Sequence, residues 1–294
     1  MKRLTAYFIA LMLLLTMLTG CARETPQVVA TTAPVYEFTR LLCQGTGITI
    51  GQLVTEEVSC LHDYTLQVSQ MRMLEAAELV IISGAGLEEF LEDVLPEDSR
   101  IVDSSVGCHL HGAEHAHEHN TSHDDDHHHE TDPHIWLAPE NAMVMAQNIC
   151  KGLSEKYPAH KEIFAENLDV LLIQLSDLQE YGANTLSNLS CRELITFHDG
   201  FAYFAESFDL TILKAMEEES GSEASAKELK ELVILVHEYK LPAVFTEVNG
   251  STSAAQVICA ETGIRSFALN MAMSGQGYFE AMYHNINTIK EALE

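Results

Sequence analysis

The sequence predicts an α/β protein of two lobes, each with a mostly parallel sheet flanked by helices, joined by one long rigid helix. Short apolar runs of β type alternate with helical stretches in both halves, which is typical of βαβ units. About 270 residues follow an N-terminal apolar segment, more than a typical single domain contains. Between the halves, Phe164, Leu168, Leu171 and Leu175 are spaced by four, three and four residues, which predicts one face of a helix.

The elements of the first half are bounded by glycine and proline. We expect strands at residues 28–31, 48–54, 79–82 and 100–103, and helices at 35–43, 67–77, 87–94 and 140–156. A helix that Pro158 opens and that continues to about residue 189 would be roughly 45 Å long and would act as a strut. A coiled-coil dimerisation helix is the alternative interpretation of this segment.

The second half repeats the alternation. We expect strands at residues 194–197, 210–213, 243–246 and 267–269, and helices at 201–208, from 225, from 253 and at 278–293. Capping boxes of Ser225 with Glu228 and of Ser253 with Gln256 would begin two of these helices. The predicted N-terminal lobe therefore comprises residues 28–156, the linking helix 157–190 and the C-terminal lobe 191–294.

The first twenty residues have the pattern of a secretory signal peptide. Lys2 and Arg3 precede an apolar run at residues 7–18 that is short for a membrane span. The run ends Leu-Thr-Gly-Cys at residues 18–21, which resembles the lipobox of bacterial lipoproteins. We therefore predict a signal peptide at 1–20, lipid on Cys21, a tether at 21–27 and an extracytoplasmic, membrane-anchored protein. An ordinary signal peptide with an incidental cysteine is the alternative.

The charge is strongly acidic. The chain carries 44 Asp and Glu against 16 Lys and Arg, a formal net charge of −28. This balance argues against a nucleic-acid partner and suits a protein that collects cations. We expect a monomer.

Nine of the fifteen histidines lie in one acidic tract. Imidazole is a ligand for zinc, copper and nickel, so this composition predicts a metal-binding loop at residues 108–131. Its few apolar residues predict disorder without metal. The expected accessory ligands are His109, His111, His115, His117, His119, His123, His127, His128 and His129. A solvated acidic loop is the alternative.

Three further histidines follow predicted strands: His62, His134 and His198. Ligands of open α/β sheets bind beyond the carboxyl ends of strands, so these rings could meet in the cleft between the lobes. Three imidazoles suit tetrahedral zinc with one position left over. A lone histidine is more often a surface or core residue than a ligand.

Four groups of motifs carry a family resemblance. They are HDY at residues 62–64 with MRMLEAAELVI at 71–81, DPHIWL at 132–137, TFHDGF at 196–201, and FTE at 245–247 with AETG at 260–263. In this order, over nearly the whole chain, they resemble the zinc- and manganese-binding solute-binding proteins of bacterial ABC importers. The resemblance implies a metal held between two α/β lobes and ligands at His62, His134 and His198. It also implies delivery of Zn²⁺ to an ABC permease and its ATPase.

Two departures leave the fourth ligand open. The family often has a carboxylate where this chain has Asn270, and Cys60-Leu61 precedes His62 in place of Asp-Pro. Water, Asn270, a tract histidine or the Cys60 thiol could complete the site. The manganese branch generally has Glu where His198 stands, and a nitrogen ligand favours zinc.

Three other functions remain alternatives. A manganese importer component would share the architecture, and a zinc reservoir or adhesin would bind zinc without transport. A zinc hydrolase would also use three histidines and an open position, but it needs a general base. Glu247 is the only candidate for that base, and no HExxH motif is present, so we expect no enzyme.

Overall fold

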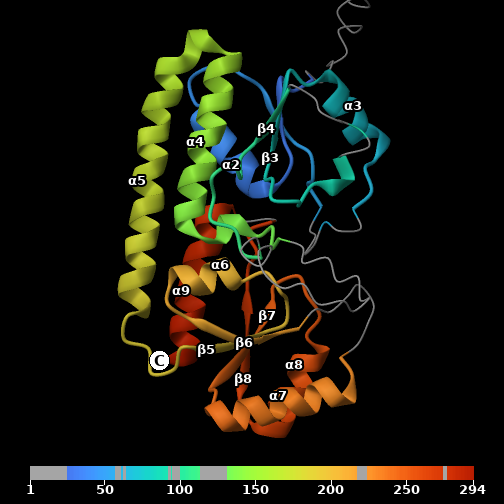
Figure 1. The fold of residues 1–294 in the computed structure, drawn as a ribbon, viewed down its shortest axis with the longest axis vertical. Helices are drawn as coiled ribbons and strands as arrows, with labels where there is room; N and C mark the ends of the chain where they lie inside the picture. The colour runs from blue at the N-terminus through green and yellow to red at the C-terminus, as the bar shows by residue number, and fades with distance from the viewer. Residues whose placement is uncertain are drawn as a thin grey trace, which may run out of the picture.

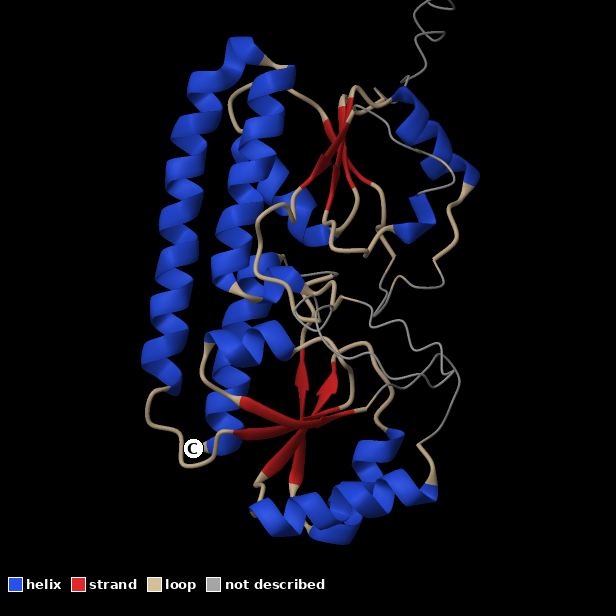
Figure 2. Cartoon of the chain, in the orientation of Figure 1, coloured by secondary structure: helices blue, strands red, loops and turns tan. Residues whose placement is uncertain are grey.

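The computed structural model describes residues 25–56, 61, 64–91, 94, 100–112, 131–216, 224–273 and 277–294. Two parallel four-stranded sheets lie at opposite ends of the long axis (Figures 1 and 2). The first sheet contains β1 (Val28–Ala30), β2 (Ile50–Gln52), β3 (Leu79–Ile82) and β4 (Ile101–Asp103). The second contains β5 (Glu193–Thr196), β6 (Thr211–Ala215), β7 (Ala243–Glu247) and β8 (Arg265–Leu269).

The two sheets have the same topology. Their strand orders are β2-β1-β3-β4 and β6-β5-β7-β8. In each sheet the chain first adds a strand on one side and then crosses to the other. A topological switch point therefore lies between β1 and β3, and another between β5 and β7, where open α/β sheets bind ligands.

Helices cover both sheets. The α-helices are α2 (Ala33–Leu42), α3 (Val68–Ala76), α4 (Pro139–Lys156), α5 (Lys161–Leu186), α6 (Ala202–Ser207), α7 (Ala226–Tyr239), α8 (Ser253–Thr262) and α9 (Tyr278–Leu293). Short 3₁₀ turns are η1 (Glu89–Leu91), η3 (Ile135–Leu137) and η4 (Pro158–His160). The sequence-based prediction of two parallel sheets flanked by helices is confirmed. None of the described helices is long and apolar enough to cross a membrane.

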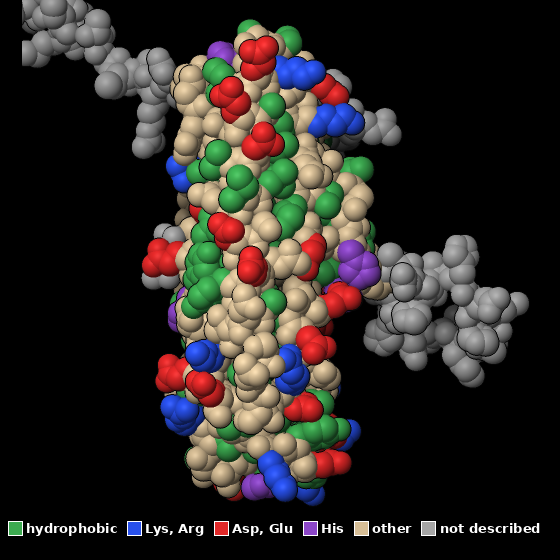
Figure 3. Space-filling model, turned by 90° about the vertical axis from the view of Figure 1, so that its left-hand side faces the viewer, with side chains coloured by type: hydrophobic (Ala, Val, Ile, Leu, Met, Phe, Trp, Pro, Cys, Tyr) green, Lys and Arg blue, Asp and Glu red, His purple; other side chains and the backbone are tan. Residues whose placement is uncertain are grey.

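Helix α5 is the predicted strut. It begins at Lys161, after the 3₁₀ turn that Pro158 opens, and its 26 residues extend about 39 Å. Its buried side includes Leu171, Leu175 and Leu178, as the four-and-three spacing predicted. It lies beside α4 in the upper half and contacts α9 (Figure 1). The face that α5 turns to solvent carries acidic side chains between apolar ones (Figure 3).

The two halves share one hydrophobic core. The largest cluster joins Val28 of the first sheet, Trp136 of η3 and Ile289 of α9, each fully buried. Smaller clusters fill the outer layers: Leu74 lies between the first sheet and α3, and Ile258 lies in the layer of α7 and α8. A parallel sheet needs such cover on both faces. The continuous core favours small relative movements of the lobes. We propose that the two lobes comprise residues 28–156 and 191–294.

Two local predictions differ from the structure. The Ser225–Glu228 capping box is present, but Ser253, the other expected cap, is the first residue of α8. The N-cap is Thr252, one residue earlier, and it makes no side-chain cap hydrogen bond. Gln256 instead donates to the Thr252 hydroxyl. In place of a helix from residue 87, η1 forms, because Leu91 N–H bonds the Glu88 carbonyl three residues back. The predicted signal segment and Cys21 lie outside the described residues.

Candidate metal centre

His134 is held in one orientation by Asp132. The carboxylate Oδ1 accepts hydrogen bonds from the backbone N–H of His134 at 2.9 Å and from its ring Nδ1 at 2.8 Å. A proton on Nδ1 leaves the Nε2 lone pair available to a metal, and such carboxylate partners fix metal-binding histidines. The ring is 5% exposed. This motif therefore presents one buried, oriented imidazole nitrogen.

The second half of the chain anchors the segment around His134. Tyr203 of α6 donates to the Asp132 carbonyl at 2.8 Å. The indole N–H of Trp136 donates to the Met271 carbonyl at 2.8 Å, and Tyr278 of α9 donates to the Trp136 carbonyl at 2.9 Å. These partners all come from the second half of the chain, whereas His134 comes from the first. Both halves therefore position His134.

His198 follows β5 at the switch point of the second sheet. Backbone pairing continues past the strand, since Phe197 N–H donates to the Phe245 carbonyl of β7 at 2.8 Å. The ring Nδ1 lies 3.6 Å from Oε2 of Glu247, the last residue of β7. The two elements that flank the switch point thus place an imidazole and a carboxylate side by side.

The two histidines face each other through their outer nitrogens. Nε2 of His134 and Nε2 of His198 are 3.5 Å apart, and the ring planes cross at 83°. Two nitrogens at about 2.1 Å from a tetrahedral zinc ion are separated by about 3.4 Å. The spacing therefore fits two ligands of one ion.

Gly200 makes this approach possible. A Cβ at this position would lie 2.8 Å from Cδ2 of His198, 3.0 Å from Cε1 of His134 and 2.6 Å from the methyl of Met271. All three distances are shorter than side chains normally allow. A residue larger than glycine would therefore push the rings apart.

Glu247 is a second carboxyl group at the site, beside His198 as Asp132 is beside His134. It is 5% exposed, and burial raises its pKa to about 7, an effect that the nearby His134 partly offsets. A buried carboxylate without a full charge partner favours a cation beside it. The sequence had suggested Glu247 only as a catalytic base; its place behind His198 required the strand order.

The remaining predicted ligands stand differently. His62 and Cys60 lie outside the described residues, although Tyr64 N–H bonds the carbonyl of buried Leu61 at 3.0 Å. Asn270 is 9% exposed, and its Oδ1 accepts a hydrogen bond from Ala272 N–H at 2.8 Å. Asn270 and His62 as ligands therefore remain predictions.

Of the accessory tract, the structure describes His109 and His111. Both are placed beside Glu206 of α6. The other tract histidines (His115, His117, His119, His123, His127, His128 and His129) lie outside the described residues. Cys108 precedes them, and burial raises the pKa of its thiol to about 12, so it is protonated at neutral pH.

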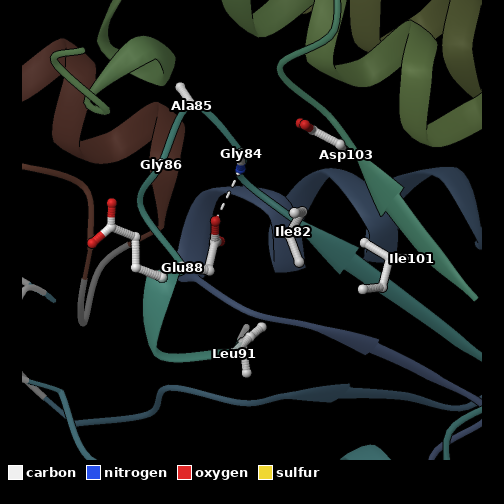
Figure 4. Close-up of a pocket in the computed structure, with 9 residues that line it drawn as sticks. Ile82, Gly84, Ala85, Gly86, Glu88, Leu91, Ile101 and Asp103 are labelled. Carbon is white, nitrogen blue, oxygen red and sulfur yellow. Dashed lines mark hydrogen bonds between the residues drawn. The ribbon is translucent and has the colours of Figure 1, made fainter. Parts of the chain in front are cut away.

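The switch point of the first sheet contains a different group, Glu88. Its Oε1 accepts from the Thr31 hydroxyl at 2.5 Å and from Ser83 N–H at 2.7 Å, and its Oε2 accepts from Gly84 N–H at 2.9 Å. Figure 4 shows this carboxylate pointing at the backbone of Gly84, with Asp103 across a small pocket. Burial is the main cause that raises the pKa of Glu88 to about 7. The Glu88 carboxylate therefore already accepts three hydrogen bonds, one from Thr31 after β1 and two from the loop after β3.

Comparison with known proteins decides the family. Residues 28–292 match the model of the family ZnuA, described as "Zinc-uptake complex component A periplasmic". The chain belongs to this family. The match spans both sheets, η3 and the elements that hold His134 and His198.

One curated relative resembles this chain in sequence, and two solved structures resemble it in fold. The zinc-binding protein AdcA of Streptococcus pyogenes serotype M3 is 26% identical over 286 residues, covering 90% of this chain and 55% of the relative. The chain thus spans about half the length of this relative. A crystal structure of ZnuA matches with a TM-score of 0.75 and 26% identity over 92% of this chain and 100% of that one. A ZnuA deletion mutant with zinc bound matches with a TM-score of 0.73 and 26% identity, over 92% and 98% of the two chains.

Proposed function

We propose that this protein captures Zn²⁺ outside the cytoplasm and delivers it to the permease of an ABC importer. The observation that carries the proposal is the 3.5 Å separation of the Nε2 atoms of His134 and His198. Membership of the zinc-uptake family supports it. In this proposal zinc is the cargo, His134 and His198 are two of its ligands, and His62 is the third.

The ligand types support zinc over manganese. Both described ligands are imidazole nitrogens, which suit zinc, whereas manganese prefers oxygen donors. Glu247 lies behind His198, 3.6 Å from Nδ1, and so adds charge to the site without replacing a nitrogen. We therefore propose Zn²⁺ as the preferred ion, with the fourth position filled by water, Asn270, Cys60 or a tract histidine.

The same geometry supports binding rather than hydrolysis. A general base must reach the water or substrate at the open coordination position. The Glu247 carboxylate instead faces the nitrogen of His198 that points away from His134. Glu247 thus has the position of a partner that orients a ligand. We propose that the protein is not a zinc hydrolase.

The proposed partners follow from the family description of a component of a zinc-uptake complex. They are an ABC permease and its ATPase. We also propose that lipid on Cys21 anchors the protein to the membrane. We propose that the protein acts as a monomer. The acidic tract would supply or store zinc with lower affinity than the cleft.

Zinc affinity and zinc uptake test this function together. Chelator competition should show a large affinity loss for His134→Ala and little change when residues 113–130 are replaced by a short linker. His237→Ala, which alters an exposed histidine of α7, is the matched control. Competition between zinc and manganese for the purified protein measures its ion preference.

Transport needs its own measurement. Cells that depend on this chain and its permease should accumulate less zinc at limiting supply when they carry His134→Ala. Normal accumulation by that variant would overturn delivery to a permease even if zinc binding in vitro were lost. Unchanged affinity in vitro would overturn the cleft site itself.

A further inference from the structure

His109, His111 and Glu206 form a compact group outside the cleft pair. Their ligand atoms all lie within 4.8 Å of one another. Nε2 of His111 is 2.9 Å from Oε2 of Glu206, and Nε2 of His109 is 3.5 Å from the same oxygen. The 3.5 Å spacing matches that of two ligands of one tetrahedral ion, which are about 3.4 Å apart, and the 2.9 Å spacing is that of an ion pair. Two imidazoles and one carboxylate are a donor set typical of zinc sites.

The backbone that carries the two histidines is fixed by buried polar groups. Asn141 of α4, 3% exposed, accepts from His109 N–H and donates to the His109 carbonyl, both at 2.9 Å. His111 N–H donates to the Tyr203 hydroxyl at 2.9 Å, and the two rings pack with centroids 4.3 Å apart. Four contacts thus hold a short loop segment that would otherwise need ordering by the metal.

One ring nitrogen is available to bind a metal ion. Nε2 of His111 is buried from solvent and makes no hydrogen bond to any described residue, despite its closeness to Glu206. A buried polar atom without a hydrogen bond is costly, and a bound cation would remove that cost. The Glu206 side chain is 55% exposed, so an ion can reach the group from solvent.

We infer that His109, His111 and Glu206 bind a second Zn²⁺ ion at a preformed site that is separate from the rest of the His-rich tract. Glu206 is the new element: it belongs to α6 of the second half, whereas both histidines follow β4 of the first half. An ion here joins the two halves outside the cleft. This inference does not depend on the proposed transport function.

Tyr203 connects the second site to the cleft. Its hydroxyl accepts from His111 N–H and donates to the carbonyl of Asp132, whose side chain holds His134. An ion that orders the His109–His111 segment therefore stabilises the same tyrosine that anchors the cleft ligand. Occupation of the outer site thus favours the binding conformation of the inner one.

A full-length background variant isolates the second site. His134→Ala together with His198→Ala removes both described rings of the first site, and His→Gln at His115, His117, His119, His123, His127, His128 and His129 removes the other tract imidazoles. Calorimetry with zinc alone should then detect one ion. Adding Glu206→Gln should lower the affinity for that ion at least tenfold, and adding His111→Gln should abolish its binding. Glu238→Gln, which changes an exposed carboxylate of α7, should have no effect.

A background variant that binds no zinc would overturn the inference, as would an ion whose affinity is unchanged by Glu206→Gln or by His111→Gln. If the first site did not depend on His134 and His198, the background would bind two ions, and the two substitutions would still remove one. Hydrogen exchange gives a second readout: zinc should slow exchange of α6 and of the His109–His111 segment in the background variant, and Glu206→Gln should prevent the slowing of α6.

Discussion

The switch points of the two sheets have the same topology and opposite chemistry. In the first sheet, Glu88 is surrounded by three donors from its own neighbourhood, the Thr31 hydroxyl and the N–H groups of Ser83 and Gly84. In the second, the Glu247 carboxylate lies 3.6 Å from the ring Nδ1 of His198. Burial raises the pKa of both carboxyls to about 7.

The difference shows how one topology can serve stability or binding. A carboxylate whose lone pairs are filled by nearby donors stabilises a turn and has little capacity left for a ligand. A carboxylate behind an imidazole increases the ring's ability to bind a cation. The switch point alone therefore does not predict a ligand; the groups around its carboxylate do.

The largest expected effect is on zinc affinity at the second switch point. Zinc sites bind with roughly 10 to 16 kcal/mol, so one of four ligands contributes about 3 to 4 kcal/mol. His198→Ala should therefore weaken zinc binding about 300-fold. Chelator competition measures this, with His237→Ala as the control; a loss below tenfold would contradict a ligand role.

Removing the side chain at the first switch point should lower the stability of the protein and leave its zinc affinity unchanged. Glu88→Ala leaves three buried donors without their acceptor, and each such group costs about 1 to 3 kcal/mol unless water reaches it. We expect the free energy of unfolding to fall by about 3 kcal/mol at pH 6, measured with urea in metal-free protein. Glu89→Ala, at an exposed neighbour, is the control. A large loss of zinc affinity in folded Glu88→Ala would break the contrast.

Stability should depend on pH through Glu88. Its pKa in the folded protein is raised from 4.5 to about 7, mainly by burial, so between these values the folded state binds more protons than the unfolded state. The contribution of the carboxyl to the free energy of unfolding therefore falls as pH rises from 5 to 8, by about 2 kcal/mol. The difference in stability between the unmodified protein and Glu88→Gln, from urea titrations across this range, measures it. A difference that is constant with pH would show that Glu88 does not titrate there.

The smallest effect sharpens the geometry of the second switch point. In Gly200→Ala the new methyl contacts both histidine rings and should widen the 3.5 Å separation of their Nε2 atoms. We expect about a tenfold loss of zinc affinity, because misplacement costs less than removal of a ligand. Gly152→Ala, whose new Cβ would lie 2.4 Å from Cγ2 of Val102 and touch none of the candidate ligands, is the comparison. Equal zinc affinity in Gly200→Ala and the unmodified protein would show that the rings are not constrained at this point.

The local pattern predicted most of the elements. Alternating strands and helices, the apolar spacing of α5 and the Ser225–Glu228 cap all act within a few residues, so they are visible in sequence. Two predictions were wrong because nearby side chains make hydrogen bonds that the apolar pattern does not reveal. Hydrogen bonds to the Glu88 side chain draw the chain from Ser83 into a tight turn ending in η1, and Thr252 rather than Ser253 caps α8.

The sequence by itself determined the chemistry: which imidazoles and carboxylates are present, and that three histidines outside the tract were expected to follow strands. Only the tertiary structure decided the partners that are distant in the chain: His198 for His134, Glu247 for His198, and Glu206 for His109 and His111. The physical reason is that these contacts join side chains brought together by strand order and by the docking of one half on the other. Such contacts depend on the packing of the whole chain and leave no local periodicity in the sequence.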